Sequence, residues 1–293
     1  MPKAPPESGG PSRRRFLQSV GVAAAMPDLA ASTESLTRPA AASPKKAIVM
    51  IHGAFAGAWC FEAFRGVFEG QGWTVHTPDL MGHGAKAGNG PSLAGVGIAD
   101  YRAELAAILR GFAEPPVLLG HSMGGVLAQQ LAAEGLASAL VLVDPAPRAG
   151  LLPSADSERA AAQGLMYLGP FWTTIVHPNF DAAAGDSLNR VPPDRQRAVF
   201  DRFGPESGRA LFELFFWMLD GTGATVVDTD AVRCPILCVS GSEDRVVTPA
   251  TARATVAAFR NGTYRELPGH GHMLLVEPGA EDIAHSIAAW LPA

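Results

Sequence analysis

Residues 116–125 read Pro-Val-Leu-Leu-Gly-His-Ser-Met-Gly-Gly, and this stretch decides the fold. An apolar run suited to a buried strand leads into Gly-x-Ser-x-Gly, and a helix-forming segment follows. This is the context in which a nucleophilic serine is exposed on a sharp turn at the end of a strand. Side chains in place of Gly120 or Gly124 would crowd the close approach of strand and helix, so we expect both glycines to be structural. Ser122 is therefore the candidate nucleophile.

From residue 46 onward, short apolar runs alternate with longer amphipathic segments. This rhythm is typical of βα units around a mainly parallel sheet, so we predict an α/β fold with a sheet flanked by helices. We expect strands at 47–51, 74–77, 117–119, 140–143, 236–240 and 264–267. We expect helices at 58–69, 99–112, 124–133, 250–259 and 280–290.

The βα rhythm breaks down between residues 148 and 231, where the sequence is helical in pattern and rich in aromatic residues. A long insertion between two core strands is typical of a lid, although helix packing alone explains any single aromatic residue there. We therefore expect residues 45–147 and 232–293 to form the two parts of one core, and residues 148–231 to form a helical lid insertion.

Residues 1–44 are rich in Pro, Ser and Ala and are expected to be a signal or flexible segment outside the fold. Within them, residues 12–18 read Ser-Arg-Arg-Arg-Phe-Leu-Gln and precede a short apolar stretch, which resembles a twin-arginine export signal. The alternative is a basic tail without an export role. The apolar stretch falls short of the about 20 residues that span a bilayer, so we expect no stable membrane anchor. The motif predicts an exported bacterial protein, periplasmic or secreted, cleaved after Ala30 or Ala42.

Composition limits the classes of partner. Hydrophobic residues form 47% of the 293-residue chain and charged residues 17%, which allows a large core. A net charge of -5 argues against nucleic acid as a partner and favours a small neutral or apolar substrate. Cys60, Cys234 and Cys238 are expected to be core thiols, because an odd number in so long a chain does not indicate a disulfide framework. No zinc or calcium motif is visible, so we expect no metal and no cofactor.

Further motifs occur in a fixed order along the chain. They are His52-Gly53-Ala54-Phe55-Ala56-Gly57-Ala58-Trp59, Asp79-Leu80-Met81-Gly82-His83-Gly84, Gly120-His121-Ser122-Met123-Gly124-Gly125, Asp244 and Gly271-His272. This order resembles the serine esterases and lipases of the α/β-hydrolase fold superfamily over about residues 46–147 and 232–293. The resemblance implies an α/β-hydrolase fold and a metal-independent serine hydrolase.

The resemblance also implies an acid and a base, because the triad of this fold follows the chain order serine, acid, histidine. Asp244 matches the acid-bearing loop after a core strand, and His272 matches the base near the C-terminus. The acid would accept the imidazole Nδ1-H and stabilise the imidazolium. Glu243 and Asp144 remain alternatives for the acid, and His270 remains an alternative for the base.

A tetrahedral intermediate needs two N-H donors for its oxyanion. One is the amide of Met123, which follows the nucleophile at the start of a helix. The resemblance places the second in the loop after the first strand, at the amide of Ala54 with Phe55 as the neighbouring possibility. In such enzymes the histidine at the position of His52 holds the loop in shape, and we expect structural or pocket-lining roles for His83 and His121.

The implied chemistry is acyl transfer from a carboxylic ester to Ser122, followed by hydrolysis. An aromatic lid favours a small-molecule ester with an apolar acyl or aromatic part. Cofactor-free haloperoxidases, perhydrolases, hydroxynitrile lyases and carbon-carbon bond hydrolases use the same triad, so these activities stay open. A small-molecule binding protein without turnover is the alternative from another class. The sequence does not indicate the oligomeric state.

Overall fold

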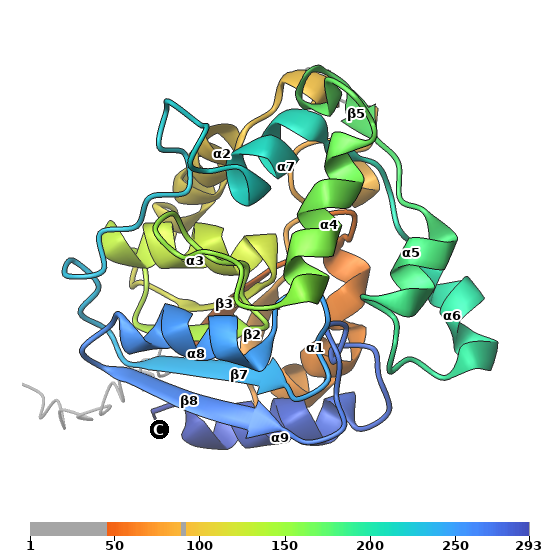
Figure 1. Ribbon diagram of the computed structural model, residues 1–293. Helices are drawn as coiled ribbons and strands as arrows, with labels where there is room; N and C mark the ends of the chain where they lie inside the picture. The colour runs from red at the N-terminus through yellow and green to blue at the C-terminus, as the bar shows by residue number, and fades with distance from the viewer. Residues whose placement is uncertain (1–45, 89–91, 293) are drawn as a thin grey trace, which may run out of the picture. The chain divides into compact units, whose positions relative to one another are not determined.

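The computed structural model describes residues 46–88 and 92–292, and the predicted export signal lies outside the described residues. At its centre is a six-stranded sheet in the order β2-β1-β3-β4-β7-β8 (Figure 1). Every pairing in this sheet is parallel. The strands are β1 (Ala47–Ile51), β2 (Thr74–His76), β3 (Val117–His121), β4 (Ala139–Val143), β7 (Ile236–Gly241) and β8 (Gly262–Leu267). The predicted α/β class and its parallel sheet are confirmed.

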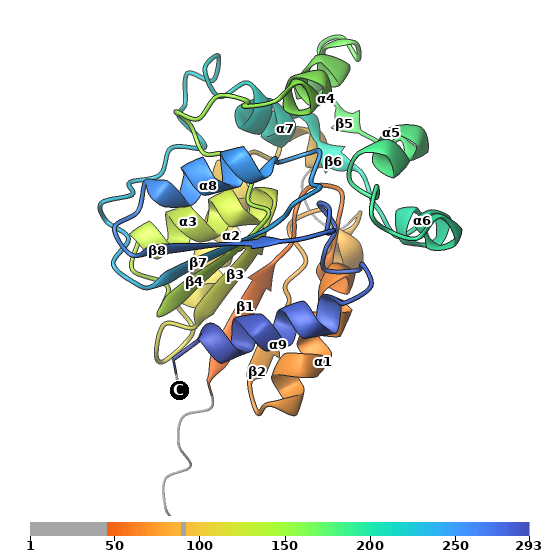
Figure 2. The same ribbon diagram turned by 60° about the horizontal axis from the view of Figure 1, so that its bottom comes forward.

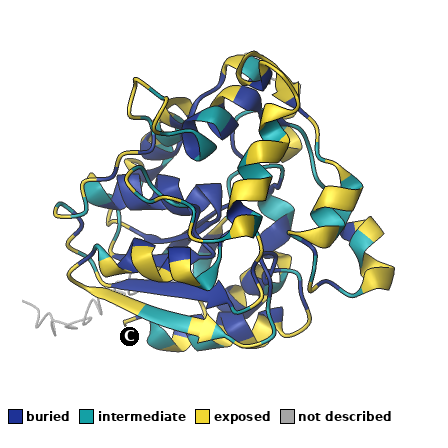
Figure 3. Ribbon diagram, viewed as in Figure 1, coloured by how far each residue is buried: buried dark blue, intermediate teal, exposed yellow. Residues whose placement is uncertain are grey.

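Alternate residues of the central strands bury opposite faces of the sheet. In β1, Val49 and Ile51 belong to one core and Ile48 and Met50 to the other, as the two-residue period of a strand requires. Such strands are apolar throughout because both faces are covered. One face packs against α2 (Ile98–Leu109), α3 (Met123–Ala133) and α8 (Pro249–Ala257), and the other against α1 (Glu62–Gly70) and α9 (Ala280–Trp290) (Figure 2). Figure 3 shows β7 and most of α3 buried, whereas α4 (Asp156–Met166) and α8 expose much of their outer surface.

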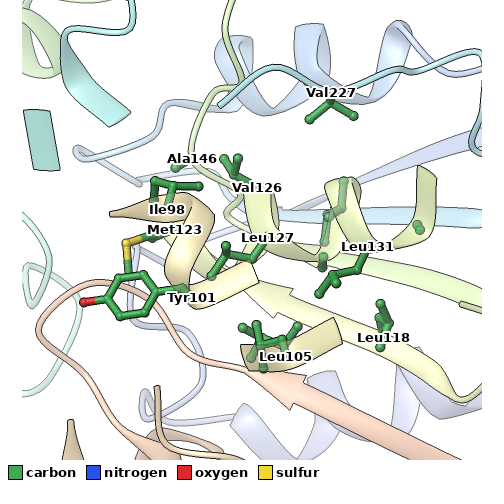
Figure 4. Close-up of a cluster of buried hydrophobic side chains, with 14 of the residues drawn as sticks. Ile98, Tyr101, Leu105, Leu118, Met123, Val126, Leu127, Leu131, Ala146 and Val227 are labelled. Carbon is green, nitrogen blue, oxygen red and sulfur yellow. The ribbon is translucent and has the colours of Figure 1, made fainter. Parts of the chain in front are cut away.

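The core beneath α2 and α3 is closely filled. Figure 4 shows Leu127 and Leu131 of α3 in one cluster with Leu105 of α2 and Leu118 of β3, and none of these side chains is more than 1% exposed. Truncating such a leucine to alanine typically costs about 2–5 kcal/mol of stability. The core therefore gives α3, whose N-terminus adjoins Ser122, a rigid support.

The three cysteines are free thiols. Cys60 and Cys238 are buried, whereas Cys234 is only partly buried and packs against the edge of a core. Burial raises the pKa of the Cys60 and Cys238 thiols, so neither supplies the thiolate that nucleophilic catalysis needs.

The chain leaves the sheet between β4 and β7, and we call residues 148–231 the inserted segment. It contains α4 (Asp156–Met166), β5 (Ile175–Val176), α5 (Phe180–Gly185), α6 (Pro193–Phe200), β6 (Glu206–Ser207) and α7 (Gly208–Phe215). Strands β5 and β6 pair as a small antiparallel sheet. Figures 1 and 2 show α4, α5 and α6 on the side toward which the sheet strands point. Among the described helices, none has the length and apolar character needed to cross a membrane.

Parallel strands place all their carboxyl ends at one edge of the sheet, where ligands bind in open α/β folds. The loops that follow β1, β3, β4, β7 and β8 carry Ala54, Ser122, Asp144, Asp244 and His272 in turn. The topology thus gathers the candidate residues at this edge.

Candidate active site

Ser122 lies in the sharp turn between β3 and α3, with φ 50° and ψ -122°. A residue other than glycine pays about 1–3 kcal/mol for such a conformation, so the surroundings must hold it. The Ser122 N-H donates to the Val143 carbonyl at 3.1 Å, and the Ser122 carbonyl accepts from Gly125 N at 2.8 Å and Ala146 N at 3.0 Å. These backbone bonds fix the turn and leave the hydroxyl free.

The glycines around the serine allow close backbone contacts. A Cβ on Gly120 would lie 2.3 Å from the Gly124 carbonyl oxygen, and a Cβ on Gly124 would lie 2.2 Å from the Ile51 carbonyl oxygen. The crowding predicted at both glycines is confirmed. A Cβ on Gly53 would also lie 2.8 Å from Ser122 Cβ, so the loop after β1 touches the nucleophile.

The structure brings His272 and Asp244 together at the same edge. His272 Nδ1 lies 2.8 Å from Asp244 Oδ2, and both residues are buried. The other carboxylate oxygen accepts from Val246 N at 2.7 Å and Val247 N at 2.9 Å. Asp244 is thereby held by the backbone, and its bond to Nδ1-H leaves Nε2 of His272 as the proton acceptor.

Ser122 and His272 are linked through the residue before the serine. His121 Nε2 donates to the His272 carbonyl at 2.9 Å, and the two rings lie 4.9 Å apart. Among the described residues, Ser122 Oγ makes no hydrogen bond to His272. In serine hydrolases this contact often shortens only when substrate is bound.

The alternative acid and base point away from this pair. His270 Nδ1 lies 3.0 Å from Glu277 Oε2, and the same carboxylate accepts the Gly271 N-H at 3.1 Å from either oxygen. The Glu243 side chain is half-exposed and pairs with Arg190 at 3.4 Å. Neither His270 nor Glu243 therefore contacts the His272–Asp244 pair.

Two amides of the loop after β1, those of Ala54 and Phe55, are the candidate oxyanion donors. The Phe55 N-H donates to Glu206 Oε2 at 3.4 Å, whereas the Ala54 N-H has no acceptor among the described residues. Met123 is the first residue of α3, so its amide has no acceptor within that helix. Ala54 and Met123 thus present amides suited to an oxyanion, and Phe55 does not.

His52 supports this loop. Its Nδ1 donates to the Gly53 carbonyl at 2.9 Å, and its Nε2 accepts from Leu80 N at 3.0 Å. Burial, reinforced by nearby His83, lowers the pKa of His52 to about 4, so the ring is neutral and both nitrogens are engaged. This is the structural role predicted for it.

Residues 48–284 match the model of the Alpha/beta hydrolase family. This chain belongs to that family. The match covers both parts of the sheet and the segment between them, so the resemblance seen in the motifs extends over most of the chain.

Known relatives of this hydrolase include two pyrethroid hydrolases and a lipase. The pyrethroid hydrolase of Sphingobium wenxiniae is 39% identical over 85 residues, which are 29% of this chain and 30% of the relative's length. The Paleococcus ferrophilus monoacylglycerol lipase superposes with a TM-score of 0.63 at 20% identity, covering 83% of this chain and 93% of the lipase. A pyrethroid hydrolase from Sphingobium faniae superposes with a TM-score of 0.62 at 23% identity, covering 84% and 96%. Both structures share the fold.

A second aspartate, Asp144, lies close to the His272–Asp244 pair. Asp144 is fully buried at φ 41°, its Oδ1 accepts from Gly241 N at 2.9 Å, and its Oδ2 has no hydrogen-bond partner among the described residues. Burial raises the pKa of Asp144 well above its usual value, and the adjacent Asp244 raises it further. Asp144 is therefore harder to ionise than an exposed aspartate.

Asp144, Asp244 and His272 also have the spacing of metal ligands, with one donor atom from each within 4.8 Å of the others. Asp244 and His272 already bond to each other. The raised pKa makes Asp144 a poorer ligand for a cation, since metals prefer the deprotonated carboxylate. The cluster is better suited to orienting a base than to holding an ion.

Aromatic side chains of the inserted segment border the oxyanion loop. Phe171, Val176 and Leu211 form a small buried cluster. Its partly buried neighbours include Ala54, Phe55, Phe212, Phe215 and Phe216. The rings of Phe212 and Phe216 stack with centroids 5.8 Å apart. Ala54, whose amide is the candidate oxyanion donor, therefore packs against an apolar cluster of the inserted segment.

Sequence reasoning missed two buried glutamates that hold site loops. Glu277 bonds the loop that carries His272, and Glu206 bonds the loop that carries Ala54. In the sequence, Glu277-Pro278 precedes the last helix, but this pattern does not indicate that Glu277 bonds to the loop of His272. Glu206 lies in a stretch whose pattern gives no signal of burial.

Proposed function

We propose that this hydrolase cleaves carboxylic esters through an acyl-enzyme on Ser122. One observation carries the proposal: a serine on a strained turn shares a sheet edge with a buried imidazole–carboxylate pair 2.8 Å apart. Family membership and the local identity to a pyrethroid hydrolase support the same reaction class.

In the acylation step, His272 Nε2 takes the proton from Ser122 Oγ as the oxygen attacks the ester carbonyl. Asp244 holds the Nδ1-H and stabilises the imidazolium. The amides of Ala54 and Met123 donate to the oxyanion of the tetrahedral intermediate. As the intermediate collapses, the C–O bond to the alcohol breaks and His272 returns the proton to the leaving oxygen.

Deacylation repeats these steps with water. His272 removes a proton from the water that attacks the acyl carbonyl, and the same two amides hold the new oxyanion. Collapse releases the carboxylic acid and returns the proton to Ser122. No cofactor takes part in either half of this reaction.

The proposed substrate is an ester with an apolar acyl or aromatic part. Support comes from the aromatic residues against the oxyanion loop, with the inserted segment serving as the lid. A further support is the local similarity to a pyrethroid hydrolase, which is 39% identical to this chain over 85 residues and whose name gives an apolar ester as its substrate.

Hydrolysis of p-nitrophenyl esters of graded acyl length, with a pyrethroid as the bulky substrate, tests this assignment. We expect kcat/KM to rise with the size of the apolar acyl group. Ser122→Ala should lower kcat by on the order of 10⁶-fold. Activity retained in Ser122→Ala would contradict the mechanism. Release of the free acid separates ester hydrolysis from lyase and perhydrolase chemistry, and tight binding without turnover would indicate a binding protein.

We further propose export through the twin-arginine route, on the strength of the Arg13-Arg14 pair followed by Phe16-Leu17. The test compares wild type with Arg13→Lys/Arg14→Lys in a bacterial host. We expect processed protein outside the cytoplasm for the wild type alone, with its new N-terminus identified by mass spectrometry. Equal export of both would contradict the proposal.

A further inference from the structure

The carboxylate of Glu206 in β6 is fully buried and accepts four hydrogen bonds. Its Oε1 accepts from Tyr101 Oη and Ser207 N, both at 2.7 Å. Its Oε2 accepts from His83 Nε2 at 3.0 Å and Phe55 N at 3.4 Å. One side chain of the inserted segment therefore joins α2, the loop after β2 and the oxyanion loop.

Glu206 carries a charge in this site. Both ring nitrogens of His83 face acceptors, since Nδ1 lies 3.1 Å from the Met81 carbonyl oxygen, so the ring holds both protons. Burial alone would lower the pKa of His83, but the Glu206 carboxylate outweighs it and the pKa is raised. Burial likewise opposes ionisation of Glu206, yet His83, the Tyr101 hydroxyl and the Ser207 amide keep its pKa low. The result is a buried ion pair, which is costly to break.

Glu206 and the backbone of Gly204 together bind Phe55. Gly204 N donates to the Phe55 carbonyl at 2.8 Å while Glu206 accepts the Phe55 N-H, so the chain at 204–206 binds both backbone groups of Phe55. Phe55 has φ 62°, a left-handed conformation that surrounding contacts must maintain. With Phe55 fixed, the preceding amide of Ala54 remains without a protein acceptor.

We propose that Glu206 is a positioning residue that fixes the oxyanion loop, so that the inserted segment sets the direction of the Ala54 N-H. This role rests on the proposed function, because an oxyanion donor matters only if Ser122 forms a tetrahedral intermediate. Glu206 acts on the transition state through Phe55 and Ala54 and does not touch the substrate.

A second buried glutamate of the same segment provides a matched control. Glu213 of α7 accepts from Ile98 N at 2.7 Å and pairs with Arg209 at 2.9 Å. It anchors the inserted segment to α2, as Glu206 does, but it makes no hydrogen bond to the oxyanion loop among the described residues. Glu206→Gln and Glu213→Gln make the same carboxylate-to-amide change at similarly buried positions.

The test measures kcat and KM for one activated ester, and the affinity for a trifluoromethyl ketone, whose adduct with serine carries an oxyanion. We expect Glu206→Gln to lower kcat by between about 10- and 100-fold, with KM changed less than about threefold, and to weaken ketone binding by a similar factor to kcat. Glu213→Gln should keep kcat within about twofold even if its melting temperature falls, because the Glu213 carboxylate bonds to Ile98 and Arg209 and, among the described residues, not to the loop.

Tyr101→Phe tests the same role if Glu206→Gln fails to fold, since it removes one donor to Glu206 and no atom of the loop. We expect a smaller fall in kcat, of about two- to fivefold, without change in KM. Equal kcat and ketone affinity in wild type and the folded variants would overturn the role of Glu206 and leave the proposed function intact. A wild type that neither hydrolyses esters nor reacts at Ser122 would overturn both.

Discussion

Asp144 and Asp244 follow neighbouring strands of the sheet, and their carboxyl groups lie close together. Asp244 accepts from two backbone amides and bonds to His272, whereas Asp144 accepts from one amide. Burial and the neighbouring Asp244 both raise the pKa of Asp144. An asparagine at position 144 would keep the shape of the side chain and an oxygen that accepts from Gly241 N.

We predict that Asp144→Asn retains kcat within about threefold, whereas Asp244→Asn lowers kcat by on the order of 10⁴-fold. Asp144→Ala should lose about 2–4 kcal/mol of unfolding free energy, because it leaves a cavity and an unpaired Gly241 amide. Ester hydrolysis and urea unfolding at pH 7 measure these effects. If Asp144→Asn loses as much activity as Asp244→Asn, the two assignments must be exchanged.

The sequence could predict the serine turn but could not rank the histidines on physical grounds. Gly120 and Gly124 reveal the turn because its crowding involves only neighbouring backbone. His270 and His272 are two positions apart, and they differ in the carboxylate that accepts from Nδ1, which is Glu277 for His270 and Asp244 for His272. Such contacts depend on side-chain packing, which spacing along the chain does not reveal.

At the scale of elements, the strands and helices of the core were predictable and those of the inserted segment were not. The core strands are short continuous apolar runs, and longer helix-forming segments separate them, so both kinds of element can be recognised in the sequence. The inserted segment uses short pieces, such as the two-residue β6 and the six-residue α5, which give no period. Its most consequential residue, Glu206, is of a type that is rarely buried unless paired.

Phe212 of α7 tests whether the inserted segment sets specificity. We predict that Phe212→Ala lowers kcat/KM for bulky apolar esters about tenfold more than for an acetate ester, since the lost wall contacts only the larger acyl groups. Tyr167→Ala is the control, because Tyr167 is 90% exposed and should leave both rates unchanged. A uniform loss for all acyl lengths in Phe212→Ala would indicate a structural role alone.

At the scale of the whole molecule, the parallel sheet brings five loops to one edge, and two buried neutral histidines sit among them. Burial lowers the pKa of His52 to about 4 and of His121 to about 3, in both cases aided by a neighbouring histidine. The unfolded chain binds protons at these rings near the ordinary pKa of about 6.5. Both therefore favour the unfolded state as the solution becomes acidic.

The free energy of unfolding should fall as the pH drops below 6.5. Each histidine contributes about 1.4 kcal/mol per pH unit within its window, and Asp144 and Glu277, whose pKa values are raised, contribute in the opposite direction. We predict a net loss that stays below about 1 kcal/mol per pH unit between pH 6 and 5. Urea unfolding at closely spaced pH values measures the slope, and a stability that is flat or rises toward pH 5 would contradict the neutral state of these rings.

Reaction of the folded protein with a fluorophosphonate shows whether Ser122 is an activated nucleophile, because the reagent modifies only a serine activated by a base and an oxyanion site. We predict a single adduct in the intact mass, located by peptide mapping at Ser122, and no adduct in Ser122→Ala. A folded wild-type protein that remains unmodified, or an adduct that persists in Ser122→Ala, would contradict it.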